Sequence, residues 1–116
     1  MTTESLIFDA LKGLVASRVY PDVAPANAVR PYITYQQVGG TAVNFLNSAQ
    51  PDKSNARVQV NVWSDTRAQA ALVSRQVESA LRAATALQTT VLGQPIAEFE
   101  EDTLLRGMRQ DFSFWT

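Results

Sequence analysis

The fold is decided by residues 56–69, which read Ala56-Arg-Val-Gln-Val-Asn-Val-Trp63 and then Ser64-Asp-Thr-Arg-Ala-Gln69. The first part alternates apolar and polar side chains, which is the pattern of a β-strand with one buried face. The second part opens a longer segment in which apolar residues recur with the period of an amphipathic helix. A strand that runs directly into such a helix predicts that the helix covers the buried face of the strand.

Within this strand, Val58, Val60 and Val62 lie on one side, and we expect them to face the core. Arg57 and Trp63 lie on the other side, among hydrogen-bonding residues. The sheet is therefore predicted to have one apolar face and one polar face.

The helix is predicted to begin after Thr66, because Thr66 and Gln69 have the spacing of a capping box. Small and branched apolar residues are expected to form its buried seam, namely Ala70, Val73, Val77, Ala80, Leu81, Ala84 and Leu87. Three arginines occupy the remaining surface of the helix: Arg67, Arg75 and Arg82.

Other segments supply the remaining elements of a small domain. Apolar residues from Leu6 to Val15 recur at helical spacing, which predicts a first helix. This helix is expected to begin near Thr3, with Thr3 as its cap, and to end by Ser17. Prolines make residues 18–25 a predicted loop. Three further strands are expected at residues 32–38, 96–102 and 109–115, the last with Phe112 and Phe114 facing the core.

The resulting order is helix, strand, strand, helix, strand, strand, which predicts a single α+β domain over residues 1–116. We expect a four-stranded antiparallel sheet with both helices packed on one face. A chain of 116 residues is long enough for one core but too short for a separate catalytic module.

The composition excludes several classes of function. The chain contains no cysteine and no histidine, which excludes disulfides, thiol nucleophiles, Cys/His metal sites and imidazole bases. A formal net charge of −1 leaves no excess of positive charge for neutralising phosphates, which disfavours nucleic-acid binding by bulk electrostatics, although a local basic patch stays possible. Sequence-specific nucleic-acid binding is not expected either. The N-terminal segment has neither the basic region of a signal peptide nor an uninterrupted apolar span, so we expect no membrane partner. No cofactor is expected.

The polar stretch between Gly40 and Asn55 is longer than a hairpin connection requires. Loops of this length without secondary structure are usually functional or disordered. Two interpretations therefore remain open, a contact arm and a disordered segment. In the first interpretation, Phe45 and Lys53 are candidate contact residues.

Two further features have both a chemical and a structural interpretation. The acidic run from Glu98 to Asp102 has the oxygen ligands that Mg²⁺ or Ca²⁺ prefers, but alternating carboxylates on a strand are more typical of a solvated or interface face. Trp63 and Trp115 could stack on nucleobases, but they have no Lys or Arg density around them. We therefore expect both tryptophans at a core edge or a subunit interface. Because the chain carries no recognisable catalytic pattern, we expect no enzymatic activity.

Four segments in this order resemble a family of phage and prophage minor tail proteins of the tail-completion or tail-terminator type. They are the Arg18-Val-Tyr-Pro21 connector with Pro31-Tyr-Ile-Thr-Tyr35, the Ala56–Trp63 strand, the alanine-rich helix after it, and Asp111-Phe-Ser-Phe-Trp115. The resemblance covers nearly the whole chain. None of these segments carries a catalytic signature.

The resemblance implies a structural virion protein with no cofactor. It implies a subunit that assembles with copies of itself into a ring, often a hexamer, which caps the tail-tube protein and meets the head-completion or connector proteins. The location implied is the head-proximal end of the phage tail, after synthesis in the bacterial host cytoplasm.

A ring requires that one patch meets a different patch on the next subunit. Carboxylates on one side of the third predicted strand could meet arginines on the second helix of a neighbour. The candidate interface residues are Glu98, Glu100, Asp102, Arg57, Arg67, Arg75, Arg82, Trp63, Trp115, Phe45 and Lys53. The alternative function is a small soluble α+β binding or regulatory module without catalysis.

Overall fold

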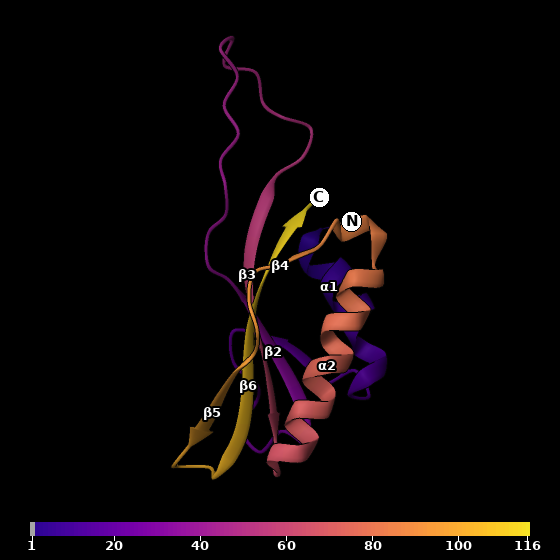
Figure 1. Cartoon of the computed structure of the whole chain (residues 1–116), viewed down its shortest axis with the longest axis vertical. Helices are drawn as coiled ribbons and strands as arrows, with labels where there is room; N and C mark the ends of the chain where they lie inside the picture. Colours follow the sequence, from indigo (N-terminus) through magenta and orange to yellow (C-terminus); the bar gives the residue numbers. More distant parts are fainter. Residues whose placement is uncertain (1) are drawn as a thin grey trace.

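The structure is a computed structural model that describes residues 2–116. Its centre is an antiparallel pair of long strands, β3 (Asn55–Ser64) and β6 (Leu105–Trp115), in register from Asn55 opposite Trp115 to Ser64 opposite Arg106 (Figure 1). The predicted valines of β3 and the predicted phenylalanines of β6 are buried: Val58, Val60, Val62, Phe112 and Phe114. The predicted inward face of these two strands is thus confirmed.

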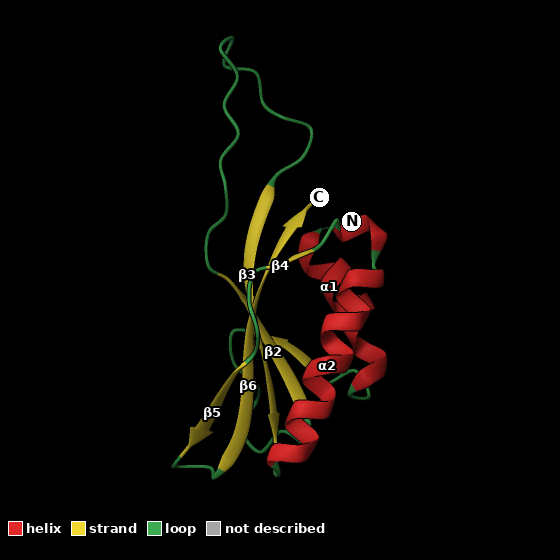
Figure 2. Cartoon of the chain, viewed as in Figure 1, coloured by secondary structure: helices red, strands yellow, loops and turns green. Residues whose placement is uncertain are grey.

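Two helices cover the inward face of the sheet, as Figure 2 shows. Helix α1 (Thr3–Leu11) is capped by Thr2, whose hydroxyl oxygen accepts a hydrogen bond from the backbone N–H of Ser5, so the prediction of Thr3 as the cap was wrong. The α-helix ends at Leu11, before the predicted limit of Ser17, and a 3₁₀ turn, η1 (Lys12–Leu14), follows it directly.

Helix α2 (Arg67–Ala83) begins at the predicted cap, where the Thr66 hydroxyl accepts a hydrogen bond from the N–H of Gln69 at 3.2 Å. The Gln69 side chain does not return this bond but accepts one from the hydroxyl of Ser64. Along the helix, Val73 and Val77 are buried in the core as expected, and a 3₁₀ turn, η2 (Thr85–Leu87), ends with the buried Leu87.

The sheet has six strands and is mixed, so the prediction of four antiparallel strands was wrong. The additional strands are β1 (Val19–Pro21) and β4 (Thr90–Val91), and the others are β2 (Tyr32–Gln37) and β5 (Ile96–Glu100). The strand order is β1-β2-β3-β6-β4, and β5 also pairs with β6. β1 runs parallel to β2 with Val19 opposite Ile33, which makes part of the predicted loop 18–25 an edge strand.

The β5–β6 hairpin differs from the expected boundaries at both strands. β5 ends at Glu100, and residues 101–104 form the turn, so Asp102 is not a strand residue. β6 begins at Leu105 rather than at 109. The extension is possible because Gly107 leaves room for the ring of Trp63, which a Cβ at this position would meet at 2.7 Å.

Both edges of the sheet carry only short strands. β1 has three residues and ends on Pro21. On the opposite edge, β4 and β5 pair with different parts of β6 and are separated by the segment that contains Gly93 and Pro95.

Residues 38–54 form an arm that leaves the sheet between β2 and β3 and extends beyond the rest of the molecule (Figure 1). The molecule measures 52 Å along this direction and 25 Å along each of the other two. The arm is the main departure from a compact body.

Candidate interaction surfaces

The base of the arm is fixed by hydrogen bonds that continue the sheet. Val38 donates its N–H to the carbonyl of Arg57 at 2.7 Å, and Arg57 donates its own N–H to the carbonyl of Gly39 at 2.8 Å. On the other limb, Ser54 and Thr116 exchange backbone hydrogen bonds at 2.9 and 3.1 Å. Because both limbs are tied to neighbouring strands, the direction in which the arm leaves the body is set by the sheet.

Asn55 and Gly40 close this base. The Asn55 carboxamide accepts from the N–H of Thr41 at 2.8 Å and donates to the Ser113 hydroxyl at 2.7 Å and to the Phe114 carbonyl at 3.0 Å. Gly40 has a φ of +154°, and a Cβ there would clash with the carbonyl oxygen of Asn55. Glycine is therefore required where the two limbs come together.

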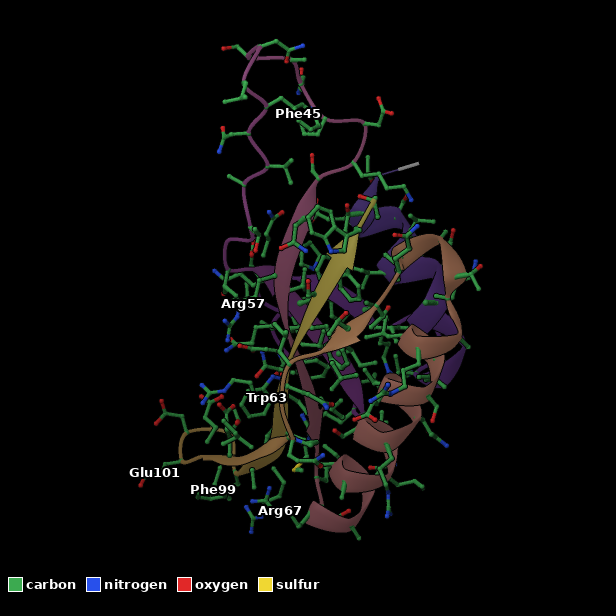
Figure 3. All side chains as sticks on the ribbon, turned by 45° about the horizontal axis from the view of Figure 1, so that its top comes forward. Phe45, Arg57, Trp63, Arg67, Phe99 and Glu101 are labelled. Atoms are coloured by element: carbon green, nitrogen blue, oxygen red, sulfur yellow. The ribbon has the colours of Figure 1, made fainter. Side chains whose placement is uncertain are left out.

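The tip of the arm is a turn that exposes two large apolar side chains. Ser48 donates its N–H to the carbonyl of Phe45 at 3.0 Å, and the Asn47 carboxamide accepts from the N–H of Ala49 at 3.0 Å. Phe45 is half exposed and Leu46 is fully exposed. In Figure 3, Phe45 lies far from the other labelled side chains. The candidate Lys53 is also in the arm and is exposed.

The outer face of the sheet carries charges that are paired within the subunit. Arg57 donates to Asp111 at 2.7 Å across β3 and β6, and Arg109 lies 3.1 Å from Glu98 across β6 and β5. Figure 3 shows Arg57 on the side of the sheet away from the helices. Of the three carboxylates predicted to share one side, Glu98 and Glu100 do so on β5, whereas Asp102 lies in the turn.

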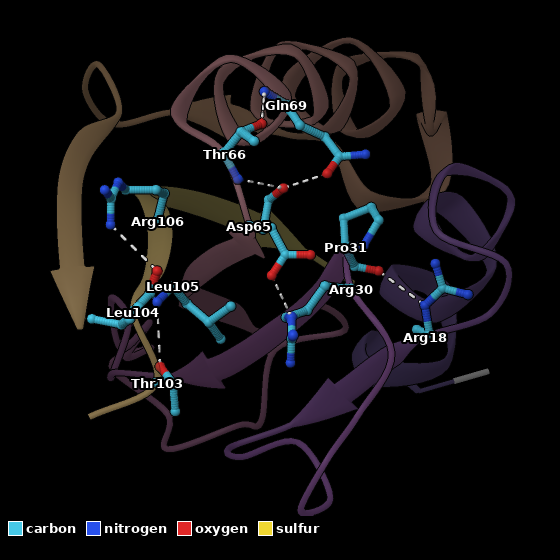
Figure 4. A network of polar contacts seen from close by, with 11 residues as sticks. Arg18, Arg30, Pro31, Asp65, Thr66, Gln69, Thr103, Leu104, Leu105 and Arg106 are labelled. Atoms are coloured by element: carbon cyan, nitrogen blue, oxygen red, sulfur yellow. Dashed lines mark hydrogen bonds and ion pairs between the residues drawn. The ribbon is translucent and has the colours of Figure 1, made fainter. Parts of the chain in front are cut away.

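The end of the β5–β6 hairpin exposes Phe99 and Leu104. The guanidinium of Arg106 lies 4.2 Å from the centre of the Phe99 ring and donates a hydrogen bond to the carbonyl of Leu104 at 3.3 Å. Figure 4 shows the hydrogen bond from Arg106 to Leu104 together with the bond from the Leu105 N–H to the Thr103 hydroxyl. The hairpin and the arm lie at opposite ends of the molecule (Figure 1).

The three arginines of α2 are in different environments. Arg67 donates to the carbonyls of Gly107 at 3.1 Å and Glu98 at 3.3 Å, so it fastens the start of the helix to the hairpin of its own subunit. Arg82 pairs with Glu78 at 3.1 Å. Arg75 lines an open groove on the helices.

This groove has a volume of about 460 Å³ and is lined by Leu14, Leu72, Ala80, Arg75, Gln76 and Ser79. Leu72 is 51% exposed although it is a large apolar residue in the middle of α2. The groove thus has an apolar floor, contributed by η1 and α2, and a polar rim. Sequence reasoning did not single out Leu72, although its place outside the predicted seam of the helix was a usable signal.

Buried polar groups connect α2 with the sheet. Gln110 is buried and donates to the Glu78 carboxylate at 2.8 Å and to the Gly93 carbonyl at 2.9 Å. The bond from Gln110 lowers the pKa of Glu78, and Arg82 adds to this effect while burial opposes it. Among residues 2–116, no donor forms a hydrogen bond with the carboxamide oxygen of Gln110.

The polar network in Figure 4 also holds the chain before β2. Arg30 donates to Asp65 at 2.7 Å, and Arg18 donates to the carbonyl of Pro31 at 2.9 Å. Nearby, burial and the charge of Glu100 raise the pKa of Tyr32. These contacts between segments distant in the chain were not predicted.

The two tryptophans lie at different places on the outer face. Trp63 covers Gly107 near the hairpin, and Trp115 is opposite Asn55 at the base of the arm; both are partly buried. Over the described residues, no three acidic side chains converge in a way that could hold a metal ion. No helix in the same range is long and apolar enough to cross a membrane.

The firmly based arm, the exposed hairpin end and the apolar groove are features typical of a protein that contacts other proteins, and the described residues offer no catalytic cluster. The chain belongs to the tail completion protein gp17 family, whose sequence profile matches residues 7–116. It is therefore a tail component of phage-like virions and not an enzyme. The resemblance to tail-completion proteins is confirmed.

Comparison with solved structures gives the same fold. A chain in the virion of a native gene transfer agent (GTA) particle matches with a TM-score of 0.60 at 15% sequence identity, over 97% of this chain and 92% of that chain. No curated protein matches the chain significantly in sequence.

Proposed function

We propose that this protein caps the tail tube and joins the tail to the head, and that it does so as a ring of identical subunits, with a hexamer as the expected size. The family match over residues 7–116 is the observation that carries this proposal. The matching chain of similar fold in a gene transfer agent virion supports it. The proposed partners are the tail-tube protein and the head-completion or connector proteins, and the proposed location is the head-proximal end of the tail.

The distribution of charge supports a head-to-tail ring. Glu100 belongs to the outer face of the sheet, whereas Arg75 belongs to the helices that cover the opposite face. A closed ring requires contacts between two unlike patches, and patches on opposite faces satisfy this requirement when each subunit follows the last. Glu98 and Arg82 extend the two patches, although each also has a partner in its own subunit.

The remaining candidates stay proposals for the same interfaces. Arg57, Trp63 and Trp115 are on the outer face of the sheet, and Phe45 and Lys53 are in the arm. We place Arg67 and Asp102 outside the proposed charge contact. The Arg67 guanidinium already donates to two backbone carbonyls that fasten the helix to the hairpin, and Asp102 is not on the strand.

Light scattering coupled to size exclusion, with the protein alone and with assembled tubes of the cognate tail-tube protein, tests the ring. We expect a discrete oligomer, either alone or on the tube, and a ring at one end of the tube in electron micrographs. A protein that stays monomeric and does not bind the tube at any concentration would contradict the proposal and favour the small binding module.

A charge exchange tests the proposed contact within the ring. Glu100→Arg and Arg75→Glu should each weaken ring formation, because each places like charges opposite one another. The double variant should restore it. Glu4→Arg, which changes an exposed carboxylate on α1, is the matched control. Normal ring formation by both single variants would contradict the contact and leave the ring itself unaffected.

A further inference from the structure

The tip of the arm carries apolar side chains that are exposed to solvent in the isolated subunit. Its tip turn places Phe45 and Leu46 at the corner, and the side chain of Leu46 has no protein cover. An exposed apolar pair at the end of a projecting element is typical of a site that is covered on binding.

The arm is directed away from the helices of its own subunit. Its two limbs continue the hydrogen-bonding pattern of the sheet through Val38, Gly39 and Ser54, and Asn55 closes the base. Figures 1 and 3 show the tip beyond the end of the sheet, well separated from α2.

The groove between η1 and α2 has the complementary character. Leu14, Leu72 and Ala80 provide an apolar floor, and Gln76, Ser79 and Arg75 provide polar groups around it. It is a shallow, open depression with a mostly apolar lining, so it can receive exposed side chains from another surface but does not enclose them. An apolar centre with a polar rim is also the usual composition of a protein interface.

We propose that the arm tip of each subunit docks in the η1–α2 groove of the neighbouring copy, with Leu46 and Phe45 against Leu72. This inference rests on the proposed ring. A ring gives every subunit one neighbour to receive its arm and one to supply an arm, so both apolar surfaces are covered at every interface.

The reach of the arm fits this arrangement. Residues 41–46, between the base and the tip, span about 20 Å when extended. The molecule is 25 Å across in its two shorter directions, so the length of the arm is comparable with the width of one subunit and restricts its reach to an adjacent copy. The carboxamides of Asn44 and Asn47 flank the apolar pair and match the polar rim of the groove.

Cross-linking between cysteine variants tests the contact directly, because the chain has no native cysteine. Leu46→Cys and ¹⁵N-labelled Leu72→Cys are mixed, assembled with tubes of the cognate tail-tube protein, and treated with a short bismaleimide. Mass spectrometry then identifies labelled chains joined to unlabelled ones, which excludes a link within one subunit. Val23→Cys, at another exposed apolar site, replaces Leu72→Cys in the control.

We expect the Leu46–Leu72 link to exceed the Leu46–Val23 link on the order of tenfold, because docking raises the local concentration of the two thiols. Thermal unfolding of each variant verifies that it is folded. Rings without the Leu46–Leu72 link, or a link from Leu46→Cys to the tube protein instead, would overturn the arm contact and leave the ring proposal standing. A Leu46–Leu72 link without rings would support the arm contact and contradict the ring proposal. If neither the link nor rings form, both proposals are overturned.

Discussion

The β3–β6 centre and the arm use apolar side chains in opposite ways. Phe112 and Phe114 in β6 are completely buried, and their rings stack with centres 6.1 Å apart. Phe45 in the arm is 50% exposed and Leu46 has no protein cover at all. A buried apolar side chain stabilises the fold in proportion to the area removed from water, whereas an exposed one contributes little until a partner covers it.

If the proposed assembly is correct, stability and assembly depend on separate parts of the chain. Substitutions in the body should change the free energy of unfolding of the subunit, and substitutions at the arm tip should change assembly alone. Four predictions test that separation, beginning with the largest expected effect.

Phe112→Ala should lower the free energy of unfolding by about 3–5 kcal/mol, because it leaves a cavity in a fully buried site. Phe45→Ala removes the same atoms from the arm and should change the free energy of unfolding by less than about 0.5 kcal/mol. Denaturant unfolding followed by tryptophan fluorescence measures both. Equal losses in the free energy of unfolding for the two variants would mean that the arm packs on the body of its own subunit. Stability would then not be confined to the body.

Gly40→Ala should destabilise the junction of the arm by about 1–3 kcal/mol, because the added methyl group clashes with the Asn55 carbonyl. The same substitution at Gly93, where a Cβ has open space, is the control and should be close to neutral. Limited proteolysis of residues 38–54 provides a second measurement, and we expect faster cleavage only in the Gly40 variant. Unchanged cleavage and stability would mean that the arm base is not held as tightly as its contacts indicate.

Glu78→Gln should lower the free energy of unfolding at pH 7 by about 1 kcal/mol, because the hydrogen bond from Gln110 then has a neutral acceptor instead of a charged one. The pKa of Glu78 is lowered below its ordinary value of 4.5 in the folded protein. Its stabilising effect is therefore complete above 4.5 and is lost as the pH falls below that value through the folded pKa. The difference between the unfolding free energies of the two proteins should therefore shrink as the pH is lowered stepwise from 7 into the acid range, and a constant difference would contradict this assignment.

The smallest expected effect concerns the surface pair of Arg57 and Asp111. A double-mutant cycle to alanine should give a coupling energy of about 0.2–1 kcal/mol, because Arg57 is half exposed and water screens the pair. The coupling should fall further at high salt. A much larger value, insensitive to salt, would show that the outer face of the sheet is shielded from solvent and contributes to the body rather than to assembly.

Local patterns in the sequence predicted most of the body. Alternation identified the buried valines of β3 and the phenylalanines of β6, and helical spacing identified the seam of α2. These predictions succeeded because each element buries one regular face, so the pattern in the chain repeats the geometry of the fold. Thr66 was also identified, since a cap depends only on residues a turn apart.

Contacts between distant segments could not be predicted in this way. β1 is a strand because Val19 pairs with Ile33, although the prolines around it favour a loop. β6 extends through Gly107 because Trp63, distant in the chain, fills the space beside it. The long connection was identified as a possible arm, but its direction depends on Asn55 and on the pairing of Ser54 with Thr116.

The short edges of the sheet have a consequence for solubility. A long exposed edge strand can recruit another copy and polymerise into an open fibre. Here β1 ends on Pro21 after three residues, and the other edge is interrupted before Pro95, where proline cannot donate to a neighbouring strand. Copies of this protein can therefore be present at high concentration with little tendency to aggregate by strand pairing, while contacts through side chains stay available.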